Sequence, residues 1–399
     1  GATVTPALSP AFAPAVFEYT TTVAADVFTV TATPTLSDTN AVAWVNGVPV
    51  TSGTPSGPID LVVGTTVITT AVTAQDGLTT RTYTVTVTRP PTCMATPDDG
   101  ATAFGSYDAG AVQQAADVAL AGATVKVAGD CRGVQTRGGE TQTLYISQTL
   151  TVEGGYSFTD WAVSYPVTQP TTLDAQSGGR VIYATVPVTI ANLAVQNGSG
   201  ATYGGGIYAG QSLALSDVQV LSNTAVSGGG AFANASATVT GGRFENNTTS
   251  GDGGGLRAVG AATVTGATFV GNTAATAGGA LFDTGSTVAN TNFVGNSTVI
   301  TGSAGGGYFN GIAALTNVTF TLNTAGSAGG GGAVFANAAA LLGGEFVSNT
   351  AAYAGGGAYF NGAASLTGTR IDGNTATADR GGGAYFNSTA ILSATTFAG

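Results

Sequence analysis

The chain has 399 residues, with 62 glycines, no histidine and only 8% charged side chains. Its formal net charge of −11 leaves no positive surface for nucleic acid, so nucleic-acid binding is not expected. Long helix-forming side chains are scarce, which favours strands and turns and predicts an all-β fold. No apolar run approaches the roughly 20 residues of a membrane-spanning helix, so no membrane span is expected in this chain.

Residues 1–90 alternate apolar residues with Thr or Ser, as in "FEYTTTV" and "TRTYTVTVTR", and Asn-Gly, Asp-Gly and proline turns break the runs. This pattern predicts an antiparallel β-sandwich of about seven strands. The stretches "LSPAFAPAVFEYTTTV", "VNGVPVTSG" and "VTAQDGLTTRTYTVTVTR" resemble the cadherin-like β-sandwich modules of bacterial surface proteins. The resemblance implies a spacer or interaction module without catalysis.

Residues 91–122 are expected to form a linker and the N-terminal cap of a repetitive domain. The prolines of "RPPTC" mark the boundary, because proline cannot donate to a sheet ladder. The stretch "DAGAVQQAADVALAG" then predicts a short amphipathic helix with Asp108 as its N-cap and Gly122 after its end. Cys93 and Cys131 flank this helix; an oxidising compartment would pair them, and the alternative is two buried thiols.

Residues 123–399 are expected to form a parallel β-helix, because a period near 25 residues recurs from about residue 190. Its clearest marker is an Asn, first at Asn197 and then at Asn223, Asn247, Asn272, Asn296, Asn323, Asn349 and Asn374. Three residues before each Asn from Asn223 to Asn374, the chain has a large apolar residue: Val220, Phe244, Phe269, Phe293, Phe320, Phe346 and Ile371. Five residues before each of these apolar residues, the chain has a second one: Leu215, Val239, Val264, Val288, Leu315, Leu341 and Leu366.

Each repeat is predicted to be one coil of a right-handed parallel β-helix with three short strands, and residues 123–190 the first coils with longer loops. The two apolar columns would then stack inside. The Asn would occupy a tight turn in the left-handed conformation, with its amide bonded to the Asn of the next coil, and the glycines would form the following corner. Because "TTFAG" places Phe397 in the inner column, the chain would stop within a coil. We expect the native protein to continue, and the alternative is that another molecule covers the open coil.

The repeated "GGGAYFN" predicts a strand whose middle residue points outward. We call the residues at this position the outer stripe: Tyr208, Phe232, Arg257, Leu281, Tyr308, Val334, Tyr359 and Tyr385. Two interpretations remain open. The side chains stack to stabilise a parallel ladder, or they form an exposed contact surface for sugar rings or a neighbouring molecule.

The motifs "GGGIYAG", "GGALFDTG" and "FVGN" resemble the repeats of polymorphic outer-membrane proteins and related bacterial β-helix surface proteins, over residues 201–399. This resemblance implies a β-helix and a surface or adhesive role. Several coils of the chain depart from the family pattern by carrying GGG in place of GGA.

Catalysis is not expected from the residues present. Polysaccharide hydrolases on this fold need clustered aspartates with His and a basic residue, and the chain has no His. Asp252 and the pair Asp379–Arg380 lie five repeats apart, roughly 24 Å by strand spacing, so they cannot share one substrate bond. Asp98 and Asp99 in "PDDG" are expected to form a solvated turn, with a calcium site as the alternative; no other cofactor is expected.

The sequence therefore predicts a non-enzymatic structural or adhesive protein, extracellular or on a bacterial cell surface. It would build a fibre or surface layer, or attach to partners, and its partners would be copies of itself, other surface proteins or glycans. The alternative is a carbohydrate-active or glycan-binding β-helix.

Overall fold

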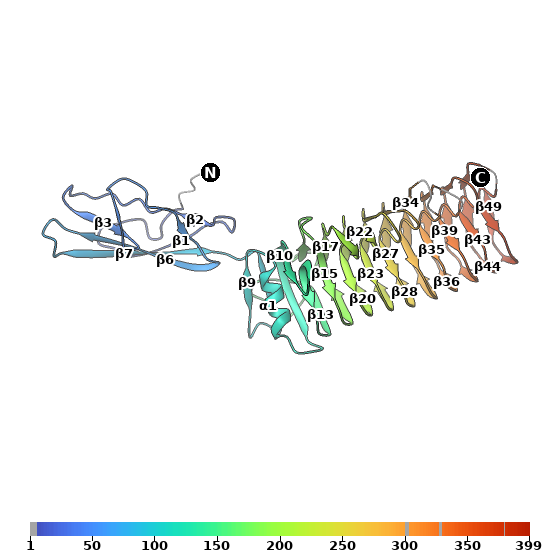
Figure 1. The fold of residues 1–399 in the computed structure, drawn as a ribbon, viewed down its shortest axis with the longest axis horizontal. Helices are drawn as coiled ribbons and strands as arrows, with labels where there is room; N and C mark the ends of the chain where they lie inside the picture. Colours follow the sequence, from blue (N-terminus) through green and yellow to red (C-terminus); the bar gives the residue numbers. More distant parts are fainter. Residues whose placement is uncertain (1–5, 300–302, 327–328, 379) are drawn as a thin grey trace. The chain divides into compact units, whose positions relative to one another are not determined.

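The computed structural model describes residues 6–299, 303–326, 329–378 and 380–399 (Figure 1). The fold is all-β, as predicted, with one short helix in the described chain, α1 (Gly110–Val118). The chain divides into two compact units. The first extends to Thr92 and includes Gly105–Tyr107, and the second comprises Cys93–Phe104 and Asp108–Gly399.

The described part of the first unit holds seven strands in two sheets. They are β1 (Glu18–Thr22), β2 (Thr29–Val30), β3 (Val42–Val45), β4 (Val48–Val50), β5 (Ile59–Asp60), β6 (Gly64–Thr73) and β7 (Thr80–Arg89). Five of them form a sheet in the order β1-β7-β6-β3-β4, and β2 pairs with β5. The core between them contains Val23, Val45, Leu61, Ile68 and Val87.

One pairing in this unit differs from the predicted antiparallel sandwich. β1 runs parallel to β7, whereas the other pairs are antiparallel. The difference arises because β1 and β7 are the first and last strands of the unit, so no tight hairpin constrains their direction. The predicted Asn-Gly turn does form a hairpin: Asn46 and Gly47, both with positive φ, join β3 to β4.

The second unit begins with a cap. Helix α1 buries Ala111, Val112 and Ala115 against the first strands of the β-helix. The side chain of Gln113, also buried, pairs with the main chain of Tyr145, beyond the end of the hairpin partner Gln135–Arg137: its Oε1 accepts from the Tyr145 N–H (2.8 Å) and its Nε2 donates to the Tyr145 carbonyl (3.1 Å). The cap therefore satisfies backbone groups that an uncovered strand would leave unpaired.

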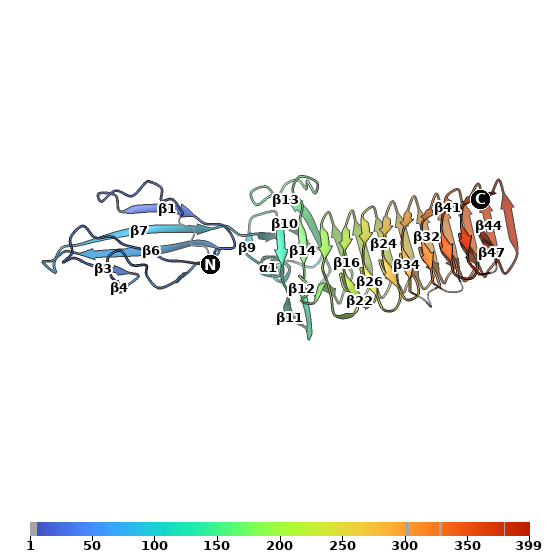
Figure 2. The ribbon, with the colours of Figure 1, turned by 90° about the horizontal axis from the view of Figure 1, so that it is seen from above.

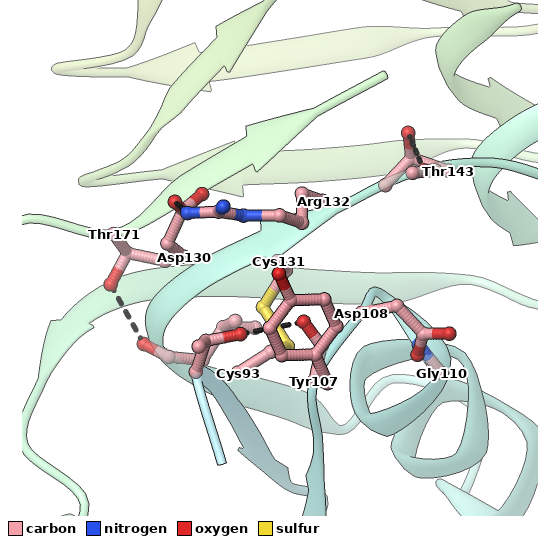
Figure 3. The surroundings of a disulfide bond; sticks show 12 residues. Cys93, Tyr107, Asp108, Gly110, Asp130, Cys131, Arg132, Thr143 and Thr171 are labelled. Atoms are coloured by element: carbon pink, nitrogen blue, oxygen red, sulfur yellow. Dashed lines mark hydrogen bonds and ion pairs between the residues drawn. A yellow bond between two sulfur atoms is a disulfide. The ribbon is translucent and has the colours of Figure 1, made fainter. Parts of the chain in front are cut away.

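At the cap, the predicted N-cap is wrong and the predicted disulfide is confirmed. The N-cap is Ala109 and makes no side-chain bond, so the prediction of Asp108 is wrong by one residue; the Asp108 carboxylate accepts from the Gly110 N–H at 2.8 Å. The predicted disulfide is present: Cys93 and Cys131 are bonded and join β8 (Cys93–Thr96) to β10 (Thr124–Arg132), as Figure 3 shows. β9 (Phe104–Ser106) lies between β8 and α1 in the chain.

Beyond the cap, successive coils stack side by side to the end of the chain (Figures 1 and 2). Each regular coil contributes one strand to each of four walls, and strands pair in parallel with their copies in the neighbouring coils. The predicted parallel β-helix is therefore confirmed. Each regular coil has four strands, whereas three were expected; the additional strand is short and follows the Asn of the repeat.

Wall 1 contains the "AYF" segments; in it β11 and β12 are antiparallel and the other pairs are parallel. Its strands are β11 (Gln135–Arg137), β12 (Glu140–Ile146), β15 (Arg180–Ala184), β19 (Ile207–Ala209), β23 (Ala231–Ala233), β27 (Leu256–Ala258), β31 (Ala280–Phe282), β35 (Gly307–Phe309), β39 (Ala333–Phe335), β43 (Ala358–Phe360) and β47 (Ala384–Phe386).

Walls 2 and 3 form one continuous sheet. Wall 2 comprises β10, β13 (Leu150–Tyr156), β16 (Val188–Ala191), β20 (Leu213–Ser216), β24 (Ala237–Thr240), β28 (Ala262–Thr265), β32 (Ser286–Ala289), β36 (Ala313–Thr316), β40 (Ala339–Leu342), β44 (Ala364–Thr367) and β48 (Ala390–Ser393). Wall 3 comprises β14 (Thr172–Asp174), β17 (Ala194–Gln196), β21 (Gln219–Leu221), β25 (Arg243–Glu245), β29 (Thr268–Val270), β33 (Asn292–Val294), β37 (Thr319–Thr321), β41 (Glu345–Val347), β45 (Arg370–Asp372) and β49 (Thr396–Ala398).

Wall 4 is the short wall that follows the Asn. It comprises β18 (Ala201–Tyr203), β22 (Thr224–Ser227), β26 (Thr248–Thr249), β30 (Thr273–Ala274), β34 (Ser297–Thr298), β38 (Thr324–Ala325), β42 (Thr350–Ala351) and β46 (Thr375–Ala376).

The interior is filled by the predicted apolar columns. From Phe244 to Phe346 the rings of wall 3 stack nearly parallel, with centroids 4.6–4.8 Å apart. This spacing equals the distance between neighbouring strands, so each ring lies directly over the next. A second stack runs inside wall 1 from Phe282 to Phe386. The rings from Phe244 to Phe360 are the largest fully buried side chains of the described chain, so each contributes strongly to the apolar core.

The corner between walls 3 and 4 is held by the Asn ladder: Asn223, Asn247, Asn272, Asn296, Asn323, Asn349 and Asn374. The geometry at Asn296 is typical. Its Oδ1 accepts from the main-chain and side-chain N–H groups of Asn272 (3.0 and 2.9 Å), and its Nδ2 donates to the carbonyl of Phe269 (2.9 Å) and to Oδ1 of Asn323 (3.0 Å). One buried side chain therefore joins neighbouring coils on both sides.

The left-handed conformation lies one residue before the ladder, not on it. Ser222, Asn246, Leu322 and Ser348 have positive φ, whereas the ladder residues do not. Asn197 aligns with Ser222 through the pairing of β17 with β21, so Asn197 belongs to the left-handed position and Gly198 occupies the ladder position of its coil. An Asn in the ladder is required for its buried hydrogen bonds rather than for its backbone freedom.

The glycines that follow provide room for the ladder. A Cβ added to Gly279 would lie 2.4 Å from the carbonyl oxygen of Gly306, 2.8 Å from Phe293 and 3.3 Å from Cγ of Asn296. Hydrogen at this position is therefore a packing requirement set by the neighbouring coil and the Asn side chain.

Replacing one ladder residue should weaken the β-helix strongly. Asn296→Ala leaves buried donors of Asn272 and the Phe269 carbonyl without partners, so we expect the free energy of unfolding to fall by about 3 kcal/mol or more. Urea denaturation followed by circular dichroism measures this fall. Asn310→Ala, at an exposed position, is the control and should change little; equal effects would contradict the structural role of the ladder.

A methyl group at the glycine corner should be destabilising. Gly279→Ala overpacks the corner and is expected to lower the free energy of unfolding by about 1–3 kcal/mol. Gly285→Ala is a matched control because its Cβ would come no closer than 3.7 Å to a neighbour. Urea denaturation of both variants tests the packing argument, which fails if Gly279→Ala is as stable as the control.

Loss of the disulfide should destabilise the second unit. The bond closes a separation of 38 residues, for which chain entropy predicts a contribution of about 4 kcal/mol. The double variant Cys93→Ala/Cys131→Ala should therefore unfold at lower urea concentration than the oxidised protein. Reduced wild-type protein is the control and should behave like the variant.

Candidate binding groove on the outer face

The outer stripe lies on wall 1, and its residues pair in register from coil to coil as predicted. The interpretation as a continuously exposed surface is wrong. Phe232, Leu281 and Val334 are each only 5% exposed, and the other members are partly buried. The corner before each wall 1 strand lies close to the stripe: a Cβ on Gly228 would lie 2.8 Å from Cβ of Phe232.

The stripe extends further toward the cap than the sequence analysis found. Tyr145 and Tyr183 pair in register with Tyr208, and the three rings stack at 5.8 and 5.0 Å. The signal was present in the sequence, since "LYI" and "IYA" have the same apolar-Tyr-apolar alternation as the later strands. These coils lack the Asn marker, so the repeat did not reveal them.

In the first part of the stripe, the tyrosine rings pack against Arg180, which is 4% exposed. Its guanidinium lies 4.8 Å from the Tyr183 ring centroid and donates to the carbonyls of Tyr203 and Gly204 and to Glu140. Burial lowers the pKa of Arg180, with Glu140 opposing the shift, and burial also raises the pKa of the Tyr183 hydroxyl. In this part of the stripe the stacked tyrosines and the buried arginine pack against one another and stabilise the wall.

The middle of the stripe is closed by ion pairs. The Arg257 guanidinium lies 2.8 Å from an Asp252 carboxylate oxygen and 3.1 Å from one of Asp283. Asp252 therefore has a structural partner and does not extend freely into solvent. Leu281, the next member of the stripe, is buried.

The last part of the stripe is hollowed. Here a groove of about 320 Å³ opens on wall 1, a volume at the lower end of the range for small-molecule sites. Its main lining residues are Tyr308, Val334, Tyr353, Tyr359, Arg380 and Tyr385. Four of these were predicted members of the stripe, whereas Tyr353 and Arg380 come from the loops after wall 4 and could not be placed by the repeat.

The groove combines stacked rings with a cation. The rings of Tyr359 and Tyr385 stack with centroids 5.1 Å apart. The Arg380 guanidinium lies 5.9 Å from the ring centroids of both Tyr353 and Tyr385, and its Nη1 is 3.4 Å from the Tyr385 hydroxyl. Such a surface presents apolar ring area together with hydrogen-bond donors.

A second hollow, of about 560 Å³, lies beside the cap and is lined by Asp99, one of the two candidate calcium residues. Nζ of Lys126 lies 2.6 Å from Oδ1 of Asp99 and donates to the Trp161 carbonyl at 2.6 Å. Asp98 forms a turn, and the hydrogen bond from the Thr102 N–H is the main cause of its lowered pKa.

The described part of the chain contains neither a cluster of metal-binding residues nor a membrane-spanning helix. No group of three or more His, Cys, Asp or Glu residues could hold a metal ion there. No helix among the described residues is long and apolar enough to span a membrane. Asp379, considered above with Arg380, lies outside the described residues.

Comparison with known proteins bears on the first unit. Residues 2–90 match the family model of the cadherin-like β-sandwich domain. Neither a curated protein nor a solved structure matches the chain. The cadherin-like domain together with the β-helix suggests a surface or adhesion-type module.

Proposed function

We propose that the chain is a non-enzymatic adhesive or structural module of a bacterial cell surface. The observation that carries this proposal is the combination of a cadherin-like sandwich with a long parallel β-helix. The "GGALFDTG" and "FVGN" repeats resemble those of polymorphic outer-membrane proteins, which supports a surface location. The disulfide supports an oxidising, extracellular compartment.

The internal chemistry of the β-helix also supports a structural role. The buried side chains of the Asn ladder bond one coil to the next, and Asp252 and Asp99 are paired with Arg257 and Lys126. The proposed partners are copies of the chain, other surface proteins and glycans. A glycan-binding role is the second candidate, and the groove at Tyr359 and Arg380 favours it.

The adhesive role predicts that beads coated with the full chain retain bacterial or host cells several-fold better than beads coated with an unrelated protein of similar charge. Low-shear washing and microscopy measure retention. The unfolded, reduced chain is the matched control and should retain few cells.

An enzymatic role would give a different result. Plant and bacterial polysaccharides incubated with the protein would then acquire new reducing or unsaturated ends, which reducing-sugar assay and ultraviolet absorbance detect. We expect no product; product formation that follows the folded protein would overturn the proposal.

A further inference from the structure

One corner of the β-helix carries a long insertion. Residues 157–171 join β13 to β14, at the corner between walls 2 and 3. In each later coil only two residues span this corner, as Asn192 and Leu193 do between β16 and β17. Long ordered loops inside a compact domain are commonly functional, because a short connection would be sufficient for the fold. The role of the insertion therefore has to be sought in the side chains that it presents.

The insertion is held against the first coils. The Trp161 side chain is 8% exposed and packs in a small apolar core. The Ser164 hydroxyl donates to the carbonyl of Gly154 (2.7 Å), and the main-chain N–H of Tyr165 donates to the carbonyl of Gly155 (2.6 Å). These contacts fix the path of the loop before any partner binds, so little conformational entropy would be lost on association.

The same insertion exposes apolar side chains. Val163, Tyr165 and Val167 are 48%, 53% and 92% exposed, and Pro166 is exposed as well. We call these four residues the knob. Single exposed apolar residues are ordinary on protein surfaces, but a cluster of them on an ordered loop indicates a contact surface. The insertion therefore buries one aromatic side chain to fix its own position and presents the knob to a partner.

The groove in the last coils is complementary to the knob. Its volume of about 320 Å³ is large enough for a few side chains, and the rings of Tyr353, Tyr359 and Tyr385 line it. Aromatic rings pack well against valine, proline and tyrosine side chains. The charges match as well, because Arg380 lines the groove and Asp160 is an exposed residue of the insertion.

We propose that the knob of one copy of the chain inserts into the groove of a second copy. This inference rests on the proposed structural role, for which it names the partner and the two contact sites. The knob and the groove lie on different coils, so a pair of copies still presents one unused knob and one unused groove. Such a heterologous contact builds a ring if the rotation closes and an open filament if it does not.

A lipid surface fits the knob less well than a second copy does. The insertion contains Asp160 and no basic residue, and the chain as a whole has a formal net charge of −11. Negative charge of this kind opposes contact with anionic lipids, whereas it favours a groove that carries an arginine.

Sedimentation velocity of the full chain tests the proposal. At about 100 μM, a concentration suited to contacts of small area, the wild type should show about twice the mass of the monomer or more. The knob variant Tyr165→Ser/Val167→Ser and the groove variant Tyr353→Ser/Arg380→Glu should each remain monomeric. All four substitutions are at exposed positions, so the fold should be retained. A monomeric wild type, or assembly by either variant alone, overturns the proposal.

Mixing the two variants gives a sharper test. The knob variant keeps its groove and the groove variant keeps its knob, so an equimolar mixture should form heterodimers. The heterodimer has no second intact knob and groove, so its mass should not rise further with concentration. A mixture that stays monomeric contradicts the heterologous contact.

The matched control removes exposed apolar side chains from the first unit. Val62 and Leu78 are 61% and 88% exposed, and Val62→Ser/Leu78→Ser should assemble like the wild type. Thermal denaturation establishes that every variant is folded. Should the knob variant fail to fold, Val167→Ser alone takes its place. Equal loss of assembly in the control would show unspecific hydrophobic association and overturn the proposal.

Two further measurements distinguish the alternatives. If the wild type stays monomeric and binds phosphatidylcholine vesicles, and the knob variant does not bind them, the knob contacts lipid and the proposal is wrong. The bead assay repeated with the knob variant separates this inference from the proposed function. Retention of cells by a wild type that does not assemble leaves adhesion standing without the knob contact. Assembly without retention leaves the contact standing and removes the adhesive role.

Discussion

The buried Asn ladder is the constraint on which the rest of the β-helix depends. A parallel coil must turn sharply between walls, and the turn leaves backbone groups inside the molecule that no strand can pair. The side chain of each ladder residue, such as Asn296, pairs these groups and also bonds to the coils before and after it. An unpaired buried amide costs more free energy than one formed hydrogen bond contributes, so a shift of one coil against the next would be strongly unfavourable. The ladder therefore fixes the register of all four walls.

The other features of the corner follow from the ladder. Glycines such as Gly279 are needed because the Asn side chain and the next coil occupy the space of a Cβ. The residue before the ladder must adopt positive φ, and even Leu322 does so. At the cap, where no earlier coil exists, Gln113 takes over the pairing of exposed backbone groups through Tyr145. Amide side chains therefore protect the structure both at its corner and at its first coil.

The sequence predicted the periodic part of this structure well and the irregular part poorly. Columns such as Phe244 to Phe346 recur at a fixed offset, so their burial followed from the repeat alone. The left-handed residue was misplaced by one position because Asn occurs both in the ladder and before it, as Asn197 and Asn246 show. The groove could not be predicted, because Tyr353 and Arg380 come from loops whose length and path vary between coils.

The four-wall coil has a consequence for how such proteins can change over time. Each coil contacts only its neighbours through hydrogen bonds and stacked rings that are nearly the same at every step. Duplication or deletion of a gene segment that encodes one whole period would add or remove a coil without disturbing the others. Length is thus free to vary in whole coils and in the loops between strands, whereas an insertion within a strand would move that coil's inward side chains out of the columns.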